Sequence, residues 1–146
     1  MAKEIERTFL VVNEAFKTMA VKVIHIKQGY LNRDPDRTVR VRIADDKGFL
    51  TVKGRNIGCE RLEFEYEVPL ADAEQMMYLC SGRVIDKTRY IVPFEGFTWE
   101  VDEYHKDLAG LVVTEVELEK PDAVFPMAPF AGREVTGDPA YYNSQL

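Results

Sequence analysis

The chain has 146 residues, of which 46% are hydrophobic and 11% aromatic, so it can bury one sizeable core but is too short for two ordinary domains. Its 25 acidic and 19 basic residues give a net charge of −6, which disfavours nucleic acid and anionic membranes as partners. It contains no apolar run near the roughly 18 residues of a membrane span, and no secretory signal is recognisable at its start. We therefore expect one cytoplasmic domain over residues 1–146.

Eight segments alternate between apolar and polar residues with a period of two, which predicts β-strands. In chain order they are residues 3–12, 20–32, 38–45, 49–54, 61–69, 84–93, 97–105 and 111–120. One helix is predicted over 71–80, and the proline-containing stretch 121–129 is predicted to be an extended connector. Eight strands with one or two helices favour a mainly antiparallel barrel or sandwich, because repeated parallel crossovers need more helices.

Charged side chains share one face of almost every predicted strand, because residues two apart point the same way. On this face each strand carries charges of one sign. The cations are Arg40, Arg42, Lys53, Lys87 and Arg89. The carboxylates are Glu4, Glu6, Glu63, Glu65, Glu67, Glu100, Asp102, Glu115, Glu117 and Glu119. The opposite faces are apolar and form the predicted core.

The common explanation for a charged strand face is a solvated outer surface. Separation of the charges by sign argues against it here, because like charges two residues apart repel and a bound ligand offsets that cost. If the charged faces instead line a closed barrel, so many ions require water, metal and ligand between them. Arginine and lysine pairs suit phosphate oxygens, and carboxylates suit hard cations such as Mg²⁺ or Mn²⁺. The pattern predicts a site for a polyphosphate chain.

The motifs on these strands resemble, in order, those of the CYTH superfamily, also called triphosphate tunnel metalloenzymes, and most closely its bacterial short-chain branch. They are EIER from residue 4, TVRVR from 38, TVKG from 51, EFEYEVP from 63, KTRY from 87, WEVD from 99, EVEL from 115 and GREVT from 132. The resemblance spans nearly the whole chain. It implies an eight-stranded antiparallel β-barrel that forms a tunnel and acts on compounds ending in a triphosphate.

The resemblance also implies roles for individual residues. The metal ligands would be Glu4, Glu6, Glu115 and Glu117. The phosphate-binding residues would be Arg40, Arg42, Lys53, Lys87 and Arg89. Second-tier candidates, for metal, for water or for holding the cationic side chains, are Glu63, Glu65 and Asp102. The general base stays open between Lys53, Lys87 and a carboxylate that acts through water.

One position departs from the family pattern. The opening motif of the family is Glu-x-Glu-x-Lys, and Thr8 stands where the lysine belongs. A lost hydrogen bond between an ammonium and a phosphate is worth about 1.5–3 kcal/mol. We expect Thr8 to lie in the substrate-binding site and to weaken or redirect catalysis without disturbing the fold.

These observations favour metal-dependent hydrolysis of inorganic triphosphate to diphosphate and phosphate, with Mg²⁺ or Mn²⁺ as the cofactor. The alternatives are a class IV adenylate cyclase, a thiamine-triphosphatase and a non-catalytic protein that binds polyphosphate or nucleotides. In each case the expected partner is a triphosphate-containing small molecule. A homodimer is the assembly considered for such a small enzyme, and the sequence does not indicate the role of residues 132–146.

Overall fold

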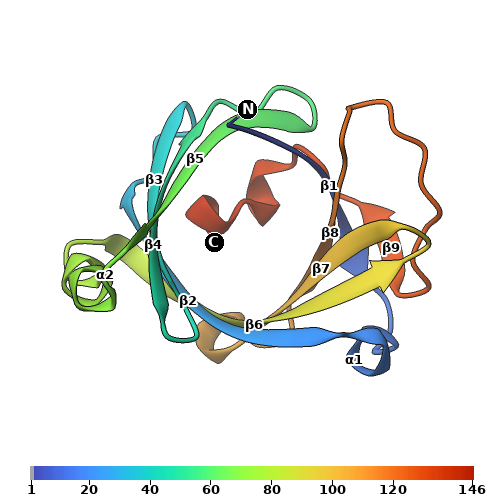
Figure 1. The fold of residues 1–146 in the computed structure, drawn as a ribbon, viewed down its shortest axis with the longest axis horizontal. Helices are drawn as coiled ribbons and strands as arrows, with labels where there is room; N and C mark the ends of the chain where they lie inside the picture. The colour runs from blue at the N-terminus through green and yellow to red at the C-terminus, as the bar shows by residue number, and fades with distance from the viewer. Residues whose placement is uncertain (1) are drawn as a thin grey trace.

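A computed structural model describes residues 2–146, in which nine antiparallel strands form one sheet that closes on itself (Figure 1). The strands are β1 (Lys3–Val11), β2 (Lys22–Asn32), β3 (Arg37–Ala44), β4 (Lys47–Gly54), β5 (Glu60–Val68), β6 (Ser81–Phe94), β7 (Phe97–Tyr104), β8 (Val112–Glu117) and β9 (Ala131–Glu134). Their order is β5-β4-β3-β2-β6-β7-β8-β1-β9, and β1 also pairs with β5. That pairing closes eight strands into the predicted barrel and rules out the sandwich.

The helices are short, and none of them is part of the barrel wall. They are α1 (Phe16–Met19), α2 (Leu70–Met77), and the 3₁₀ turns η1 (Lys106–Leu108), η2 (Pro139–Tyr141) and η3 (Asn143–Gln145). The predicted helix 71–80 corresponds to α2, whereas α1, β9 and the turns were not predicted. None of the helices described between residues 2 and 146 is long and apolar enough to cross a membrane.

Strand β1 closes the barrel by using both of its edges. One edge pairs with β8, with Glu6 opposite Glu117 and Thr8 opposite Glu115. The other edge starts against β5 at Lys3 and ends against β9 at Val11. Because β9 leads directly into residues 135–146, this pairing delivers the C-terminal segment to the barrel, and Figure 1 shows that segment within the ring of strands.

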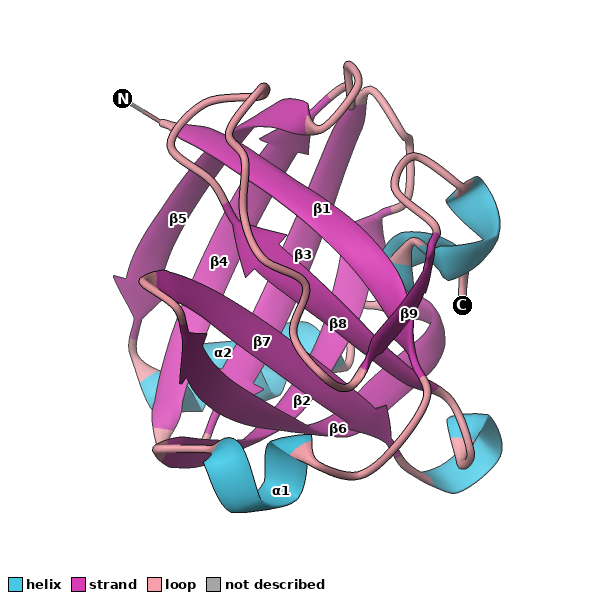
Figure 2. Cartoon of the chain, turned by 90° about the vertical axis from the view of Figure 1, so that its right-hand side faces the viewer, coloured by secondary structure: helices cyan, strands magenta, loops and turns pink. Residues whose placement is uncertain are grey.

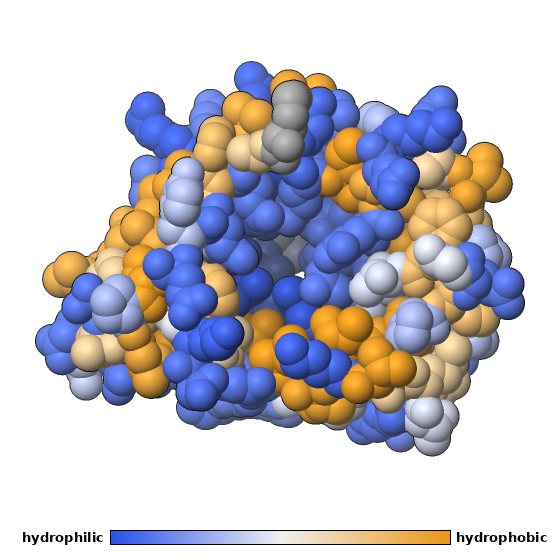
Figure 3. Space-filling view, in the orientation of Figure 1, coloured by the Kyte–Doolittle hydropathy of each residue, from blue (hydrophilic) through white to orange (hydrophobic). Residues whose placement is uncertain are grey.

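The apolar faces of the strands point outward and form the hydrophobic core with the elements that cover them. Trp99 is fully buried and packs edge-on against Phe125 and Phe130, with ring centroids 5.8 and 5.9 Å away. Both rings belong to the connector between β8 and β9, which runs across the outside of the barrel as predicted (Figure 2). Helix α2 covers another part of the wall. The charged faces line the lumen, which is hydrophilic where Figure 3 shows it, and Ile85, Tyr104 and Val113 on the same faces form a separate apolar cluster.

Candidate active site

Alternation along three strands places the predicted cations on the lumen side of the wall. Strand β3 carries Arg40 and Arg42, β4 carries Lys53, and β6 carries Lys87 and Arg89. Four of these five cations line a cavity of about 160 Å³. Its full lining is Glu4, Arg40, Arg42, Lys53, Glu63, Glu65, Arg89, Glu100, Glu115, Glu117 and Asn143. We call this space the charged cavity; every residue that lines it carries a charge except one amide.

Lys87 lies behind the cavity wall and holds a buried ion cluster together. Its Nζ donates to Asp102 Oδ2 at 2.7 Å, and Arg89 donates to both carboxylate oxygens of Asp102 at 2.8 and 2.9 Å. Burial lowers the pKa of Lys87, Asp102 opposes this, and Arg89 and Arg42 lower it further, to about 7. Burial would raise the pKa of Asp102, but its two cationic partners hold that pKa well below the usual range. Asp102 therefore holds the cationic side chains in place.

Lys53 bridges two acidic side chains across the strands that close the barrel. Its Nζ lies 3.2 Å from Glu4 Oε1 and 3.2 Å from Glu63 Oε2. Burial would raise the pKa of Glu4, but Lys53 and the hydrogen bond from Glu63 bring it down to about 2. Burial would lower the pKa of Lys53, but Glu4 and neighbouring carboxylates raise it overall. Lys53 is therefore a permanent cation, which does not suit the role of general base considered for it.

Arg40 has unused hydrogen-bonding capacity. Its Nη2 donates to Thr51 Oγ1 and to Glu65 Oε2, each at 3.1 Å. Its Nε is buried and has no partner among residues 2–146. A buried guanidinium donor without an acceptor costs free energy. An anion in the adjoining charged cavity offers the acceptor that the protein does not supply.

Two polar residues that the sequence did not indicate support Arg42 from inside the lumen. Arg42 Nε donates to Gln28 Oε1 at 2.9 Å, and Gln28 Nε2 donates to the Tyr30 hydroxyl at 3.0 Å. Gln28 is fully buried, so this contact fixes the orientation of the guanidinium. Burial, followed by repulsion from Arg40 and Arg89, lowers the pKa of Arg42 to about 10. Period-two alternation on β2 places Gln28 and Tyr30 on one face, but the sequence prediction did not divide this strand into a charged and an apolar face.

The carboxylates lie on four adjacent strands, β7, β8, β1 and β5. Glu6 on β1 faces Glu117 on β8 in register, and Glu115 on β8 faces Glu100 on β7. Burial, then Glu115 and Glu4, raises the pKa of Glu6 well above its usual value. Burial raises the pKa of Glu100 to about 7, helped by Glu115 and Glu117 and opposed by Arg89. The protein thus holds several acids close together at a cost in repulsion.

The donor set fits a divalent cation although the side chains do not form a ready-made cage. Within residues 2–146 no three acidic, histidine or cysteine side chains converge as a metal centre. Burial, then charge repulsion from Glu115 and Glu4, instead raises the pKa of Glu6, and Glu4 and Glu63 both contact Lys53. A hard cation binds carboxylate oxygens of this kind in place of a proton. A metal that displaced the proton of Glu6 would relieve the repulsion that raises its pKa.

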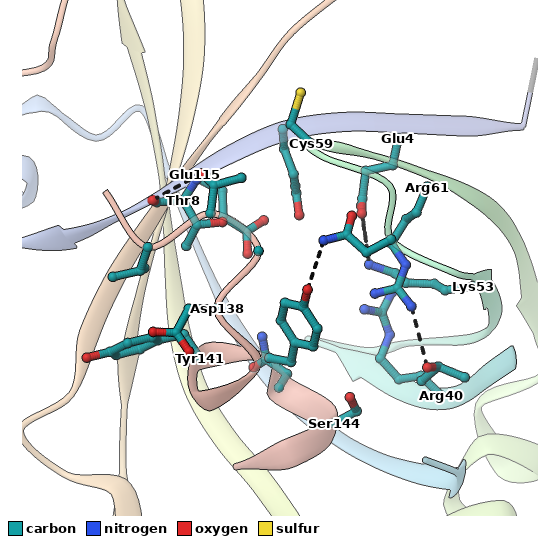
Figure 4. A pocket seen from close by; sticks show the side chains of 18 of the residues that line it. Glu4, Thr8, Arg40, Lys53, Cys59, Arg61, Glu115, Asp138, Tyr141 and Ser144 are labelled. Carbon is teal, nitrogen blue, oxygen red and sulfur yellow. Dashed lines mark hydrogen bonds and ion pairs between the residues drawn. The ribbon is translucent and has the colours of Figure 1, made fainter. Parts of the chain in front are cut away.

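Thr8 lines a second cavity, of about 90 Å³, that adjoins the charged one. Figure 4 shows Thr8 and Glu115 on one side of this cavity and Glu4, Lys53 and Arg40 on the other. The Thr8 backbone N–H donates to Thr136 Oγ1 at 2.9 Å, so the GREVT motif anchors this part of β1. Thr8 therefore lies on the wall of the second cavity, and its part in substrate binding stays a prediction.

The structure gathers the candidate residues with a few exceptions. All four acids proposed as metal ligands line one or both cavities, as do Glu63, Glu65 and Thr8. Lys87 and Asp102 lie in the wall and line neither of them. Glu67 and Glu119, expected on the charged face, are exposed and line neither cavity; for Glu119 the reason is that β8 already ends at Glu117. The residues missed are Gln28, Tyr30 and Asn143, and Glu100 was seen on the charged face without being assigned a role.

Comparisons with known proteins agree with this geometry. A family model described as CYTH domain matches residues 2–135. An inorganic triphosphatase of Acetivibrio thermocellus is 52% identical over 147 residues, covering 100% of this chain and 94% of the relative. An inorganic triphosphatase of Nitrosomonas europaea is 33% identical, covering 98% of this chain and 95% of the relative. A crystal structure of an inorganic triphosphatase matches with a TM-score of 0.68 and 31% identity, over 97% of this chain and 95% of that one.

Proposed function

The chain belongs to the CYTH domain family, and from this we propose that it is an enzyme that hydrolyses inorganic triphosphate to diphosphate and phosphate. The observation that carries the proposal is the charged cavity, in which four cations face six carboxylates. Cations alone suit any polyanion, and carboxylates alone suit any hard cation. Their presence in one cavity suits a polyphosphate bound together with metal.

In this reaction the oxygen of a water molecule attacks a terminal phosphorus atom, the bond to the bridging oxygen breaks, and diphosphate leaves. The protein contributes chiefly positioning and charge neutralisation. Arg40, Arg42 and Arg89 hold the phosphate oxygens through guanidinium donors, and Lys53 adds a compact charge. Gln28 and Asp102 keep Arg42 and Arg89 pointed at the substrate.

The water molecule must give up a proton during the attack. Lys53 is unsuited to accept it because its pKa is raised, and Lys87 faces Asp102 and Asn143 rather than the cavity. Glu100 lines the charged cavity and has a pKa of about 7, in the range that favours proton exchange near neutrality. We assign the proton to a lumen carboxylate of this kind, acting directly or through a second water molecule.

The CYTH triphosphatases are metal-dependent, and we propose Mg²⁺ or Mn²⁺ for this chain because its donors are oxygens. Glu4, Glu6, Glu115 and Glu117 would hold the ion, with Glu100 beside them. When bound, the ion supplies Lewis-acid stabilisation of charge on the phosphate oxygens. A cytoplasmic location and a homodimeric state remain predictions.

The raised pKa values make metal activation dependent on pH. Glu6 must lose its proton before it ligates a cation, and a cation bound beside Glu100 favours the ionised form of that carboxyl, whose pKa is about 7. Lowering the pH from 7 to 6 should raise the Mg²⁺ concentration for half-maximal triphosphate hydrolysis by roughly tenfold per displaced proton. Titration of activity with Mg²⁺ at several pH values measures this.

Two variants test the source of that pH dependence. Glu100→Gln should make it shallower by the contribution of one proton, because the amide does not titrate in this range and only Glu6 still does. Glu119→Gln, an exposed neighbour outside the cavities, should keep the wild-type response. A half-maximal Mg²⁺ concentration that is the same at pH 6 and pH 8 in the wild type would contradict the raised pKa values.

Restoring the family lysine at position 8 should increase activity. Thr8 lies opposite Glu115 on the wall of the second cavity, so the longer side chain of Thr8→Lys would extend among the acids toward the phosphates. One added charged hydrogen bond to a phosphate corresponds to roughly tenfold to a hundredfold in kcat/KM. Steady-state hydrolysis of inorganic triphosphate measures the gain.

Thr8→Gln provides the matched control, because it adds length and hydrogen-bonding groups without charge. It should recover much less activity than Thr8→Lys. Equal kcat/KM values for the two variants would show that charge at position 8 is irrelevant.

A competition assay separates the proposed substrate from its alternatives. No aromatic side chain is among the residues lining the charged cavity, so an adenine or thiazole ring could stack only in the second cavity, on Tyr30, Tyr141 or Tyr142. We expect inorganic triphosphate to be hydrolysed faster than ATP or thiamine triphosphate when the three compete. Preferential turnover of ATP with release of a cyclic nucleotide would favour a cyclase, and tight triphosphate binding without products would favour a binding protein.

A further inference from the structure

The C-terminal segment, residues 139–146, places one side-chain amide inside the barrel. Asn56 Nδ2 donates to the Tyr142 hydroxyl at 3.0 Å, and Arg33 donates to the backbone carbonyl of Ser144. Tyr141 and Leu146 pack against the buried cluster of Ile85, Tyr104 and Val113. These contacts on both sides of Asn143 fix its position at the lumen wall.

The oxygen of the Asn143 amide is engaged by the protein. Oδ1 accepts a hydrogen bond from Lys87 Nζ at 3.2 Å and another from the Tyr104 hydroxyl at 2.6 Å. An ammonium group only donates, so the oxygen rather than the nitrogen of the amide must face Lys87. Asn143 therefore supports the lysine that Asp102 holds from its other side.

The nitrogen of the same amide is free to bind something else. Among residues 2–146 the hydrogen bonds of the Asn143 side chain all run through Oδ1, which leaves Nδ2 without a protein acceptor. Asn143 lines both the charged cavity and the second cavity, so it lies at their boundary. It is also the one uncharged residue that lines the charged cavity. A neutral donor in this place suits a phosphate oxygen.

We propose that Asn143 binds the substrate, with Nδ2 donating to a phosphate oxygen of inorganic triphosphate while Oδ1 positions Lys87. The inference rests on the proposed function and adds to it a ligand contact from outside the barrel strands. This contact links substrate binding in the tunnel to the C-terminal segment, because the hydrogen bonds of Tyr142 and Ser144 hold Asn143 in place.

Asn143→Asp tests the contact most sharply. The two side chains have nearly the same shape, and aspartate keeps an oxygen for Lys87 and Tyr104 but replaces the free donor with a negative oxygen. We expect KM for inorganic triphosphate to rise by roughly tenfold to a hundredfold, with thermal stability retained. Gln145→Glu is the matched control, since it adds the same charge to the same segment at an exposed position, and its KM should stay within about twofold of wild type.

Asn143→Ala separates the two functions of the amide. It loses both the donor and the support for Lys87, so KM should rise and kcat should fall, whereas Asn143→Asp should change chiefly KM. Unchanged KM in both variants, or an equal rise in Gln145→Glu, would overturn the proposal.

Calorimetric binding of inorganic triphosphate in EDTA keeps this test distinct from that of the proposed function. If wild type binds triphosphate in EDTA but releases no phosphate once Mg²⁺ is supplied in excess, the hydrolytic function fails. Weaker binding by Asn143→Asp than by Gln145→Glu still supports the contact. Equal binding by the two variants refutes it even if wild type is an active triphosphatase.

Discussion

Asp102→Ala should destabilise the protein by about 3–5 kcal/mol, because it removes the carboxylate that Lys87 and Arg89 share in the interior. Within the part of the chain that the structure describes, Arg89 then keeps only its longer contact with Glu100. Asp102 is 2% exposed and Lys87 is 0% exposed, so solvent cannot replace the lost carboxylate. For a chain of this length the loss corresponds to a fall in Tm of roughly 10 °C. Thermal and urea unfolding followed by circular dichroism measure both quantities.

Loss of an ion pair at the surface is the control for the loss of stability in Asp102→Ala. Lys3 and Glu60 lie 3.3 Å apart, and both side chains are substantially exposed. Glu60→Ala should cost less than about 1 kcal/mol, as surface ion pairs generally do. If Asp102→Ala costs no more than Glu60→Ala, the buried cluster does not stabilise the barrel in the way described.

Glu115→Gln should reduce metal-activated hydrolysis of triphosphate by roughly a hundredfold or more, because it removes an oxygen ligand at the centre of the acidic strands. The same change should raise the metal-free Tm at pH 8. Glu115 raises the pKa of both Glu6 and Glu100 by charge repulsion, and an uncharged amide removes that repulsion. Opposite effects on activity and stability are the signature of a charge cluster maintained for function.

Glu119→Gln provides the control on the same stretch of chain, since it is exposed and lies beyond the end of β8. It should leave both activity and Tm near the wild-type values. Activity of Glu115→Gln within tenfold of wild type would mean that this carboxylate is not a metal ligand.

Much of the barrel could be predicted from the sequence, because each strand carries its own alternation of charged and apolar residues. Alternation alone places Arg40 and Arg42 on one face, and the closed sheet makes that face the lumen. The separation of positive and negative charges onto different strands indicated a site, because a closed lumen makes charges from distant strands face one another. The charged cavity joins Lys53 from β4 with Glu115 from β8, which are far apart in the chain.

Features that depend on long-range packing were not predictable in this way. Strand β9 is only four residues long and is specified by its pairing with β1, including the ion pair of Arg7 with Glu134 at 2.6 Å. Asn143 has no local pattern, because its position is set by contacts of the C-terminal segment with Arg33 and Asn56. The pKa of Lys87 likewise depends on burial and on Asp102 of β7 and Arg42 of β3, which meet Lys87 only in the folded chain.

The charged lumen as a whole has one consequence that separates it from an ordinary solvated surface. Arg40 keeps a buried Nε without a partner among residues 2–146, and the pKa of Glu6 is raised. The ligand-free protein therefore has both an unsatisfied cationic donor and a carboxyl group whose ionisation is disfavoured. Binding of a polyanion together with a cation satisfies both groups at once. We therefore expect triphosphate with Mg²⁺ to raise Tm more than the sum of the two separate increases.

Release of phosphate from inorganic triphosphate tests the central claim most directly. Purified protein should produce one phosphate and one diphosphate per triphosphate with Mg²⁺ or Mn²⁺, should lose this activity in EDTA, and should gain activity on Thr8→Lys. Absence of phosphate release with either metal, in both the wild type and Thr8→Lys, would contradict the assignment of this barrel as a triphosphatase.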